Sequence, residues 1–528
     1  MRISMFGMRR TTQQIGQTSS LLLKVTVAIF MAMWLVDKGF GKDDVAPSPD
    51  HSWAPPGINS YKQQLTSIND ETNLDPAVKR AGAVVEPGKI YDLPGLIDIA
   101  ERNHPETRVA WERARQAAKA VGLDESAYYP YLAASAAADY QHELGLLTTV
   151  FPANGFAEDA TLDLKWLLFD FGGRRAGVAS AREQLMMANM GFNATHQKIV
   201  FLVTKSFYDF NTARELAGVD ESAQQAAETV REAAQARFDN GLATKPEVLQ
   251  AEQQSAQAAY DLEAARGALS DAQVALVNSL GILPSTPLRV ATVPEKKFAD
   301  DPEDSLDELI DRALAQRPDL VAKLASLRAS QAEVRQARSA YYPKISLAAN
   351  GGWSKLDVNA YDSPYFGNSK PTYGVGVEIE LPLFDGFARA NKLRIAQSKL
   401  RAAESDLTDT RNEAVREVWK AYTDLKTALR KRESADKLLA SAQSAFDATL
   451  EVYRQGLGTY VDVANAQRYL TAAKSTIVDA RSDIFTGAAA LALSVGDLAK
   501  PEANSNDDAN MSKNVNKTLS AQPATHQP

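Results

Sequence analysis

The sequence predicts a mainly α-helical protein with a membrane β component, built from one unit that occurs twice. Three observations support this fold class: a long internal repeat, helical segments far longer than usual, and paired alternating segments between them. Each unit is predicted to contain a helix, a two-stranded hairpin, a long helix, a tight turn and a further helix.

The repeat is visible when the two halves of the chain are compared. Ala-Tyr-Tyr-Pro ends at Pro130 and again at Pro343, and Leu-Phe-Asp ends at Asp170 and again at Asp385. RFDNGLAT, which ends at Thr244, matches VYRQGLGT, which ends at Thr459. We therefore expect a first structural repeat at 93–281 and a second at 306–497, joined by a Pro-containing linker at 282–305.

The helical segments have an unusual length. Ala, Glu, Gln, Arg and Leu dominate 172–240 and 386–455, which predicts two helices of about 100 Å each at 1.5 Å per residue. The shorter helices of the first copy, 93–127 and 242–280, together have the length of one long helix. We expect them to stack end to end alongside it, and the second copy to repeat the arrangement.

Strand patterns separate these helices. In the last of the four predicted strands, Tyr373, Val375, Val377 and Ile379 alternate with Gly374, Gly376, Glu378 and Glu380. A soluble sheet with one buried face shows the same alternation. However, strands of about 10 residues with apolar residues outside and polar residues inside are typical of membrane barrels. An open sheet cannot exist in lipid because its edge amides lack partners, so several chains must close one barrel.

The chain ends have their own composition. Arg9 and Arg10 precede the apolar run 21–36, and Gly39 and Gly41 follow it. This order predicts a secretory signal over 1–41, with an uncleaved anchor as the alternative. We expect 42–92 to be an extended N-terminal segment and 498–528, rich in Asn, Ser, Gln and Lys, to be a disordered tail.

Composition argues against several classes of function. A formal net charge of −8 lacks the basic footprint that nucleic acid requires. The absence of cysteine excludes thiol nucleophiles, disulfides, thiolate metal sites and a lipid on an N-terminal Cys. The five histidines show no ligand spacing, and no P-loop or nucleophile elbow occurs. We therefore expect no enzyme, no cofactor and no metal, and no Met or His cluster that indicates metal cargo.

Taken together, these motifs resemble the outer-membrane efflux protein family, the TolC-like channels of Gram-negative bacteria. The resemblance covers about 93–497 and depends on the duplication, Ala-Tyr-Tyr-Pro, Leu-Phe-Asp-x-x-x-Arg, Gly-Leu-x-Thr and Val-Asp-Val-x-x-Ala-Gln (461–467). It implies a homotrimer with a twelve-stranded barrel in outer-membrane lipid, on a twelve-helix periplasmic tunnel. It also implies passive export with a periplasmic adaptor protein and an inner-membrane transporter, in an efflux pump or type I secretion.

The resemblance also suggests site residues at the two helical turns. Asp462 matches the first acid of the family's periplasmic aperture, and Asn465 replaces the second. Glu247 holds the matching position in the first copy, and we hypothesise that Tyr453 hydrogen-bonds to it across neighbouring tips. The predicted adaptor-docking tips comprise Gly241, Leu242, Thr244, Gly456, Leu457 and Thr459. A soluble periplasmic coiled-coil adaptor is the alternative function.

Overall fold

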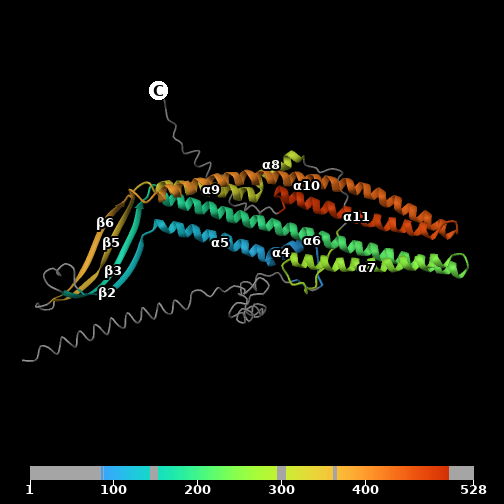
Figure 1. Ribbon diagram of the computed structural model, residues 1–528, viewed down its shortest axis with the longest axis horizontal. Helices are drawn as coiled ribbons and strands as arrows, with labels where there is room; N and C mark the ends of the chain where they lie inside the picture. Colours follow the sequence, from blue (N-terminus) through green and yellow to red (C-terminus); the bar gives the residue numbers. More distant parts are fainter. Residues whose placement is uncertain (1–84, 87, 143–152, 294–304, 361–365, 499–528) are drawn as a thin grey trace, which may run out of the picture. The chain divides into compact units, whose positions relative to one another are not determined.

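Figure 1 shows the computed structural model of the chain, which describes residues 85–86, 88–142, 153–293, 305–360 and 366–498. The predicted signal, most of the predicted N-terminal segment and nearly all of the predicted tail lie outside these residues. The first copy contains β1 (Ile90–Tyr91), α4 (Leu93–Asn103), α5 (Pro105–Glu125), the 3-10 turn η2 (Ser126–Tyr128), β2 (Tyr131–His142), β3 (Ala153–Phe169), α6 (Gly173–Asp239) and α7 (Lys245–Ser279). The second contains β4 (Arg289–Val290), α8 (Leu306–Gln316), α9 (Pro318–Ser339), β5 (Lys344–Ala360), β6 (Phe366–Glu380), α10 (Ala388–Arg454) and α11 (Tyr460–Val495).

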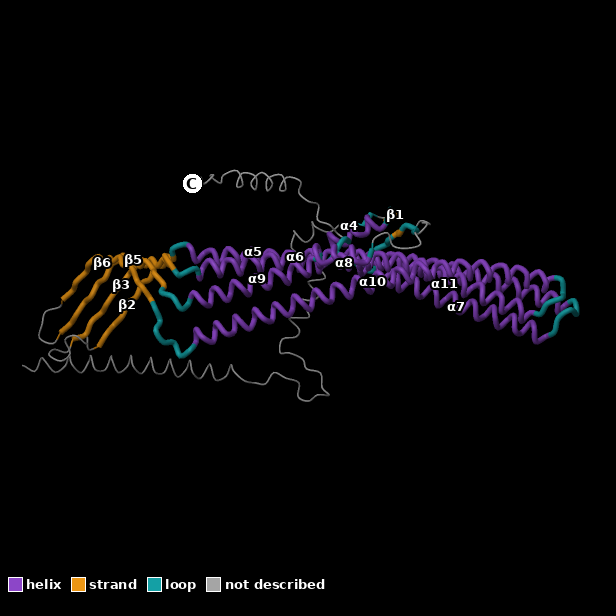
Figure 2. Tube along the Cα trace, turned by 90° about the horizontal axis from the view of Figure 1, so that it is seen from above, coloured by secondary structure: helices purple, strands orange, loops and turns teal. Residues whose placement is uncertain are grey.

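The long helices run beside the shorter ones. Helix α6 contacts both α5 and α7, and α10 contacts both α9 and α11, which confirms the predicted stacking of two short helices along each long one. Figures 1 and 2 show α6 between the pair α5 and α7 and the pair α9 and α11. The two copies therefore share one layer of helices, with α6 in contact with both.

One prediction about the helices was wrong. Each first helix was expected to be continuous, but the structure breaks it at His104 in the first copy and at Arg317 in the second. The following residue, Pro105 or Pro318, begins the next helix, and the residue before it is extended (φ −68°, ψ 126° at His104). Proline disfavours helical angles in the preceding residue, which explains both breaks.

The four long strands form one antiparallel sheet in the order β2-β3-β5-β6. Each predicted hairpin is present, and pairing of β3 with β5 joins the two copies. The strands contain 12, 17, 17 and 15 residues, so the expectation of about 10 was too short. Pairing continues past the apolar stretch into polar residues such as Glu158 and Lys355, because main-chain pairing does not require apolar side chains.

A second, smaller sheet was not predicted. Strand β1 pairs in parallel with β4, which lies within the predicted linker. Beside it, Leu96 and Ile99 of α4 pack with Ile199 and Val203 of α6 in an apolar core. This core fixes α4 on one face of α6.

The passage from strand to long helix uses the same joint in both copies. The carboxylate of Asp170 accepts the backbone N–H of Arg174 at 2.6 Å, and Asp385 accepts that of Arg389 at 3.0 Å. In both copies the aspartate thus binds an amide of the first turn of the long helix. The two residues after each aspartate have positive φ, in the order Phe171-Gly172 in the first copy and Gly386-Phe387 in the second. Each joint thus requires two left-handed residues in succession, and glycine occupies one of them.

The arginine of each joint binds main-chain carbonyl groups that precede the aspartate. Arg174 donates to the carbonyl oxygens of Leu167 at 2.6 Å and Leu168 at 3.0 Å. Arg389 donates to the Asp385 carboxylate at 2.9 Å and to the Leu383 carbonyl at 3.3 Å. In both copies the aspartate therefore binds the start of the helix. Arg174 binds the last residues of β3, whereas Arg389 binds Leu383, which lies three residues after the end of β6.

Across the described residues, no helix is both long enough and apolar enough to cross a membrane.

Replacing Gly281 with alanine should destabilise the corner between α4 and α5. Gly281 has φ +68°, and an added Cβ would lie 2.8 Å from the His104 Cα. We expect a cost of about 1–3 kcal/mol from backbone strain and steric overlap. The measurement is the thermal unfolding midpoint of the purified protein, with Gly267→Ala as control because that helical position is open. Equal midpoints for the two variants would contradict the assignment.

Candidate functional site

The two helical turns have the same main-chain structure. Gly241 N–H donates to the Phe238 carbonyl at 2.8 Å and Leu242 N–H to the Arg237 carbonyl at 2.8 Å. The second turn repeats these bonds through Gly456 and Leu457. This pattern is the Schellman motif, which ends a helix with a glycine and places the next residue outside it. Leu242 and Leu457 are accordingly 69% and 80% exposed.

The helix that follows each turn begins with a threonine. Thr459 caps α11: its hydroxyl accepts the Asp462 N–H, and the Asp462 carboxylate accepts the Thr459 N–H at 3.3 Å and its hydroxyl at 2.7 Å. In the first copy, the Thr244 hydroxyl donates to the Glu247 carboxylate at 3.4 Å. Both acidic residues that the sequence suggested for the aperture are therefore held by a threonine three residues earlier.

Tyr453 connects the two turns. It is 3% exposed and packs with Val230, Ala234 and Val463. Arg237 donates to the Tyr453 carbonyl at 2.7 Å, and its guanidinium lies 4.6 Å from the centre of the Tyr453 ring. Since Arg237 belongs to α6 and Tyr453 to α10, this contact fastens one helical turn to the other.

The hydroxyl of Tyr453 has a charged environment. Burial raises the pKa of Tyr453, Arg237 lowers it, and the negative charge of Glu247 raises it further. The hydroxyl is buried without a hydrogen-bond partner in the described part of the chain. The structure thus brings Glu247 near Tyr453 without joining them, and their pairing across neighbouring tips stays a prediction.

The remaining predicted residues lie apart from this contact. Asn465 accepts a hydrogen bond from Arg468 on its own helix, and exposed Asp462 is bound to Thr459. Sequence reasoning missed Arg237 and also Tyr460, whose hydroxyl donates to the Gln250 carbonyl at 3.3 Å. Arg237 and Tyr460 each differ from the residue at the equivalent position of the other copy. This difference between the copies is the sequence signal that could have indicated them.

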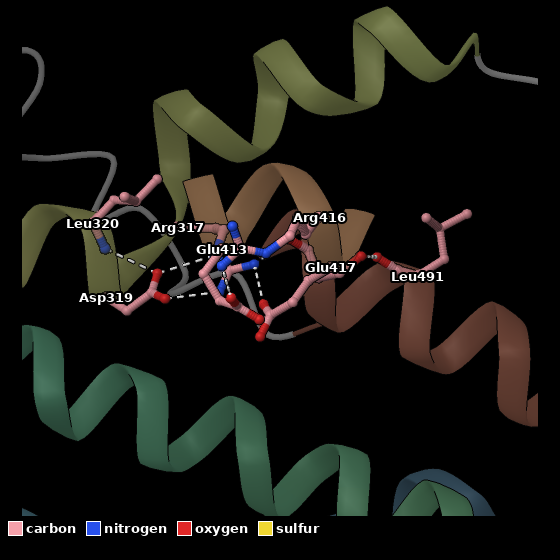
Figure 3. Close-up of polar contacts among 8 residues, drawn as sticks. Arg317, Asp319, Leu320, Glu413, Arg416, Glu417 and Leu491 are labelled. Carbon is pink, nitrogen blue, oxygen red and sulfur yellow. Dashed lines mark hydrogen bonds and ion pairs between the residues drawn. The ribbon is translucent and has the colours of Figure 1, made fainter. Parts of the chain in front are cut away.

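A second polar cluster lies at the corner between α8 and α9, shown in Figure 3. Arg317 donates to both carboxylate oxygens of Asp319, at 3.0 and 2.7 Å. Its Nη1 lies 2.6 Å from Glu417 of α10 and donates to the Ser494 carbonyl of α11 at 3.0 Å. With its side chain only 11% exposed, Arg317 ties this corner to both helices of the second copy.

The equivalent corner of the first copy has different chemistry. There, the His104 Nδ1 accepts the Glu106 N–H at 3.2 Å and so caps α5. Burial lowers the pKa of His104, while Glu106 raises it and Lys198 lowers it. Glu106 also forms an ion pair with Lys198 of α6 at 2.8 Å. A neutral histidine therefore occupies the position that the buried arginine has in the second copy.

A cleft of about 730 Å³ adjoins Arg317 between α6, α10 and α11. Its lysines face carboxylates: Lys420 lies 2.6 Å from Asp424, and Lys431 lies 3.8 Å from Asp483. On α10, Val418 packs against α8. Lys420, which lines the cleft, is two residues later and therefore lies on a different face of this helix. The cleft thus opens away from α8, and its paired charges give no preference for one sign. No group of three His, Asp or Glu residues able to hold a metal ion occurs among the described residues.

The capping role of Thr459 can be separated from any role of the Asp462 charge. Thr459→Ala should cost about 1 kcal/mol through loss of the cap while keeping the carboxylate. We expect faster hydrogen exchange over the first turn of α11 and unchanged exchange at the equivalent first turn of α7. Thr459→Ser is the control, because serine restores the hydroxyl. Unchanged hydrogen exchange in the alanine variant would show that the hydrogen bonds between Thr459 and Asp462 do not stabilise this turn.

Arg317→Met should destabilise the second copy by about 1–3 kcal/mol, since it removes the hydrogen bond to the Ser494 carbonyl and the ion pairs with Asp319 and Glu417. Arg416→Met is the control, because Arg416 pairs with Glu413 on the surface and such pairs contribute little. The unfolding midpoint at neutral pH is the measurement. Equal decreases of the unfolding midpoint in the two variants would contradict a larger stabilising contribution from Arg317 than from a surface ion pair.

Acid should reduce the effect of Arg317→Met. Burial alone would raise the pKa of Asp319, but the hydrogen bonds and charge of Arg317 outweigh it and lower that pKa below 3.8. A lowered folded-state pKa gives stability that is present above 3.8 and is lost as the pH falls below it. The difference between wild type and variant should therefore shrink on acidification, and a constant difference would exclude the ion pair as its cause.

Comparison with known proteins identifies the family. The model of the outer membrane efflux protein family matches residues 96–282 and 309–497, one segment for each copy. The chain is 28% identical over 411 residues to protein CyaE of Bordetella pertussis, covering 76% of this chain and 84% of CyaE. It is 25% identical over 427 residues to the alkaline protease secretion protein AprF of Pseudomonas aeruginosa, covering 76% and 85%.

The fold is similar to that of a solved channel. The structure matches the CmeC outer membrane channel of Campylobacter jejuni with a TM-score of 0.70 and 17% identity, over 82% of this chain and 94% of CmeC. This likeness concerns the fold, which is mainly helical with a sheet at one end of the long helices. Because the family model covers both copies of the repeat, the chain belongs to the outer membrane efflux protein family.

Proposed function

We propose that this chain is the outer-membrane exit channel of a tripartite efflux pump or a type I secretion system. Three copies close a twelve-stranded barrel in outer-membrane lipid, and their helices form a twelve-helix periplasmic tunnel. The observation that carries this proposal is a four-stranded sheet with two open edges, in a chain whose two repeats match the efflux family.

The open edges support assembly with further copies. Among the residues that the structure describes, β2 pairs only with β3, and β6 pairs only with β5. The apolar side chains of β6 are also exposed: Tyr373 by 89%, Val375 by 78% and Ile379 by 67%. Such a surface is unfavourable in water but suits lipid, provided that strands of neighbouring copies satisfy the edge amides.

The helices offer matching surfaces. Along α10, which contacts α8, α9 and α11, Ile395, Trp419 and Leu438 are each at least 50% exposed. At the other side of the helical layer, Tyr260 of α7 is 72% exposed and Val274 is 49% exposed. These two apolar stripes are suited to contact between α10 of one copy and α5 and α7 of the next, which would extend the layer into a ring.

The two repeats are proposed as 93–281 and 306–497, joined by the linker 282–305. The matched segments 96–282 and 309–497 support this division. We also retain the proposed signal over 1–41, because a chain bound for the outer membrane must be exported. The extended segment 42–92 and the tail 498–528 remain proposals of the same kind.

The proposed partners act at the helical tips. The exposed leucines of the two turns, Leu242 and Leu457, would dock a periplasmic adaptor protein, which joins the channel to an inner-membrane transporter. Asp462 of each copy would contribute to an acidic aperture. AprF is named for the secretion of an alkaline protease, whereas CmeC is named only as a channel. We therefore assign passive conduction of small molecules or polypeptides without choosing between them.

The alternative of a soluble coiled-coil adaptor is rejected. The chain belongs to a family of outer-membrane proteins, and its relatives are secretion and efflux channels. Transport rather than catalysis is the activity of this family.

Single-channel conductance in a planar bilayer tests the proposal. The detergent-purified protein should give small, cation-selective steps, because an acidic ring concentrates cations at the aperture. Asp462→Ala should lose this selectivity, whereas Glu263→Ala, which removes an exposed carboxylate of α7 far from the tips, should keep it.

The possible outcomes separate the parts of this proposal. Steps with unchanged selectivity in Asp462→Ala would keep the channel and exclude Asp462 as its selective residue. A protein that stays soluble without detergent and gives no conductance would overturn the channel itself.

A further inference from the structure

We propose that Met186, Met187 and Met190 of α6 form a binding site for a soft monovalent metal ion of the Cu(I) or Ag(I) type. The first observation is the distribution of methionine. The chain has 9 methionines, and the three between residues 85 and 498 all lie within the five-residue stretch 186–190. The proposal departs from the expectation that no Met or His cluster indicates metal cargo.

The helix brings the three side chains together. Met190 lies three residues after Met187 and four after Met186, the two spacings that place side chains next to each other on a helix. Neighbours of this kind have Cβ atoms about 5–6 Å apart, within reach of flexible methionine side chains. Three thioether sulfurs from one turn can thus approach one ion.

These methionines do not fill a core. Met186 is 45% exposed and Met187 is 40% exposed, and Met190 is partly exposed. Methionine commonly fills irregular gaps between packed elements, but an exposed side chain has no gap to fill. The sulfurs are instead accessible to an ion in solution.

The position of α6 determines which way they face. Helix α6 is flanked on its two sides by helices of its own chain, α5 and α7 on one side and α9 and α11 on the other (Figure 2). Its exposed residues therefore lie on the two faces of the helical layer. Met190 precedes Ile199, which packs against α4, by nine residues, or two and a half turns. Met190 therefore lies opposite the face that α4 covers.

The same face leads to the cleft beside Arg317. Gln197 and Phe201, which line that cleft, follow Met190 by about two and three turns of α6. In the trimer of the proposed function, on which this placement rests, the face opposite α4 lines the tunnel. Three copies would then present nine thioethers at one height around the path of the cargo.

The donor set suggests the class of ion. Thioethers are soft, uncharged ligands that favour Cu(I) and Ag(I) over Mg²⁺, Ca²⁺ or Mn²⁺. Thiols, imidazolium groups and carboxylic acids must each lose a proton before they bind a metal. A thioether has no such proton, so binding should not depend on pH between 5 and 8. Glu183 precedes Met186 and Met187 by three and four residues, and its charge adds an attraction for cations.

Titration of the detergent-purified full-length protein with silver nitrate in chloride-free buffer tests the site. We expect about one Ag(I) per chain, at the same affinity at pH 5.5 and 7.5, with sulfur neighbours in X-ray absorption. The combined variant Met186→Leu, Met187→Leu and Met190→Leu should lose this binding, since leucine keeps the apolar volume. Met190→Leu alone should weaken it most among the single variants, because Met190 neighbours both others.

A matched control and a second readout make the outcome decisive. Met511→Leu removes the methionine nearest the chain end and should retain full binding. Equal binding by wild type and the triple variant, or nitrogen and oxygen neighbours alone around silver, would overturn the site. Conductance tests the proposed function separately from the metal site. If the wild type binds no silver while the channel still conducts normally, with or without the triple substitution, only the metal site is rejected.

Discussion

The architecture depends on how each strand passes into its long helix. A helix start leaves amide groups without partners, and a strand end leaves carbonyl oxygens without theirs. The Asp170 and Asp385 carboxylates accept from the helix start. Arg174 donates to the end of β3, and Arg389 donates to Leu383, which follows β6. Because the Asp-x-x-x-Arg motif binds both sides of the joint, the chain passes from sheet to helix within residues 170–172 in the first copy and 381–387 in the second. Two such joints allow a single layer of helices to continue from a single sheet in this outer-membrane channel.

Local patterns predicted most of this fold. Hydrophobic periodicity and the internal repeat located both hairpins and both long helices, because these elements depend on neighbours close in sequence. The breaks at His104 and Arg317 were readable from the prolines that follow, but the helical composition on either side concealed them. The pairing of β1 with β4 was not readable, since four residues separated by nearly 200 positions carry no periodic signal.

The candidate site likewise contains features that local sequence predicts and features that it does not. The turns and their caps follow from Gly-Leu-x-Thr and from an acid three residues after each threonine, both local features. The contact of Arg237 with Tyr453 joins residues of two different helical hairpins, and it exists only after these pack together. Arg317 likewise acquires its meaning from Glu417 and Ser494, which belong to other helices. Long-range packing, rather than the residue types, decides which of the predicted side chains meet.

The corner at His104 and the equivalent corner at Arg317 should respond differently to pH and to salt. A histidine cap depends on a neutral ring nitrogen, and acid removes it by protonation. Arg317 keeps its charge in mild acid, so its ion pairs persist there. Because its partner carboxylates are partly exposed, salt weakens these ion pairs. Duplication has thus produced corners of the same shape with different sensitivities, one to acidity and one to ionic strength. In the proposed trimer the two kinds of corner would alternate, so a change in pH or in salt would weaken every second corner more than its neighbours.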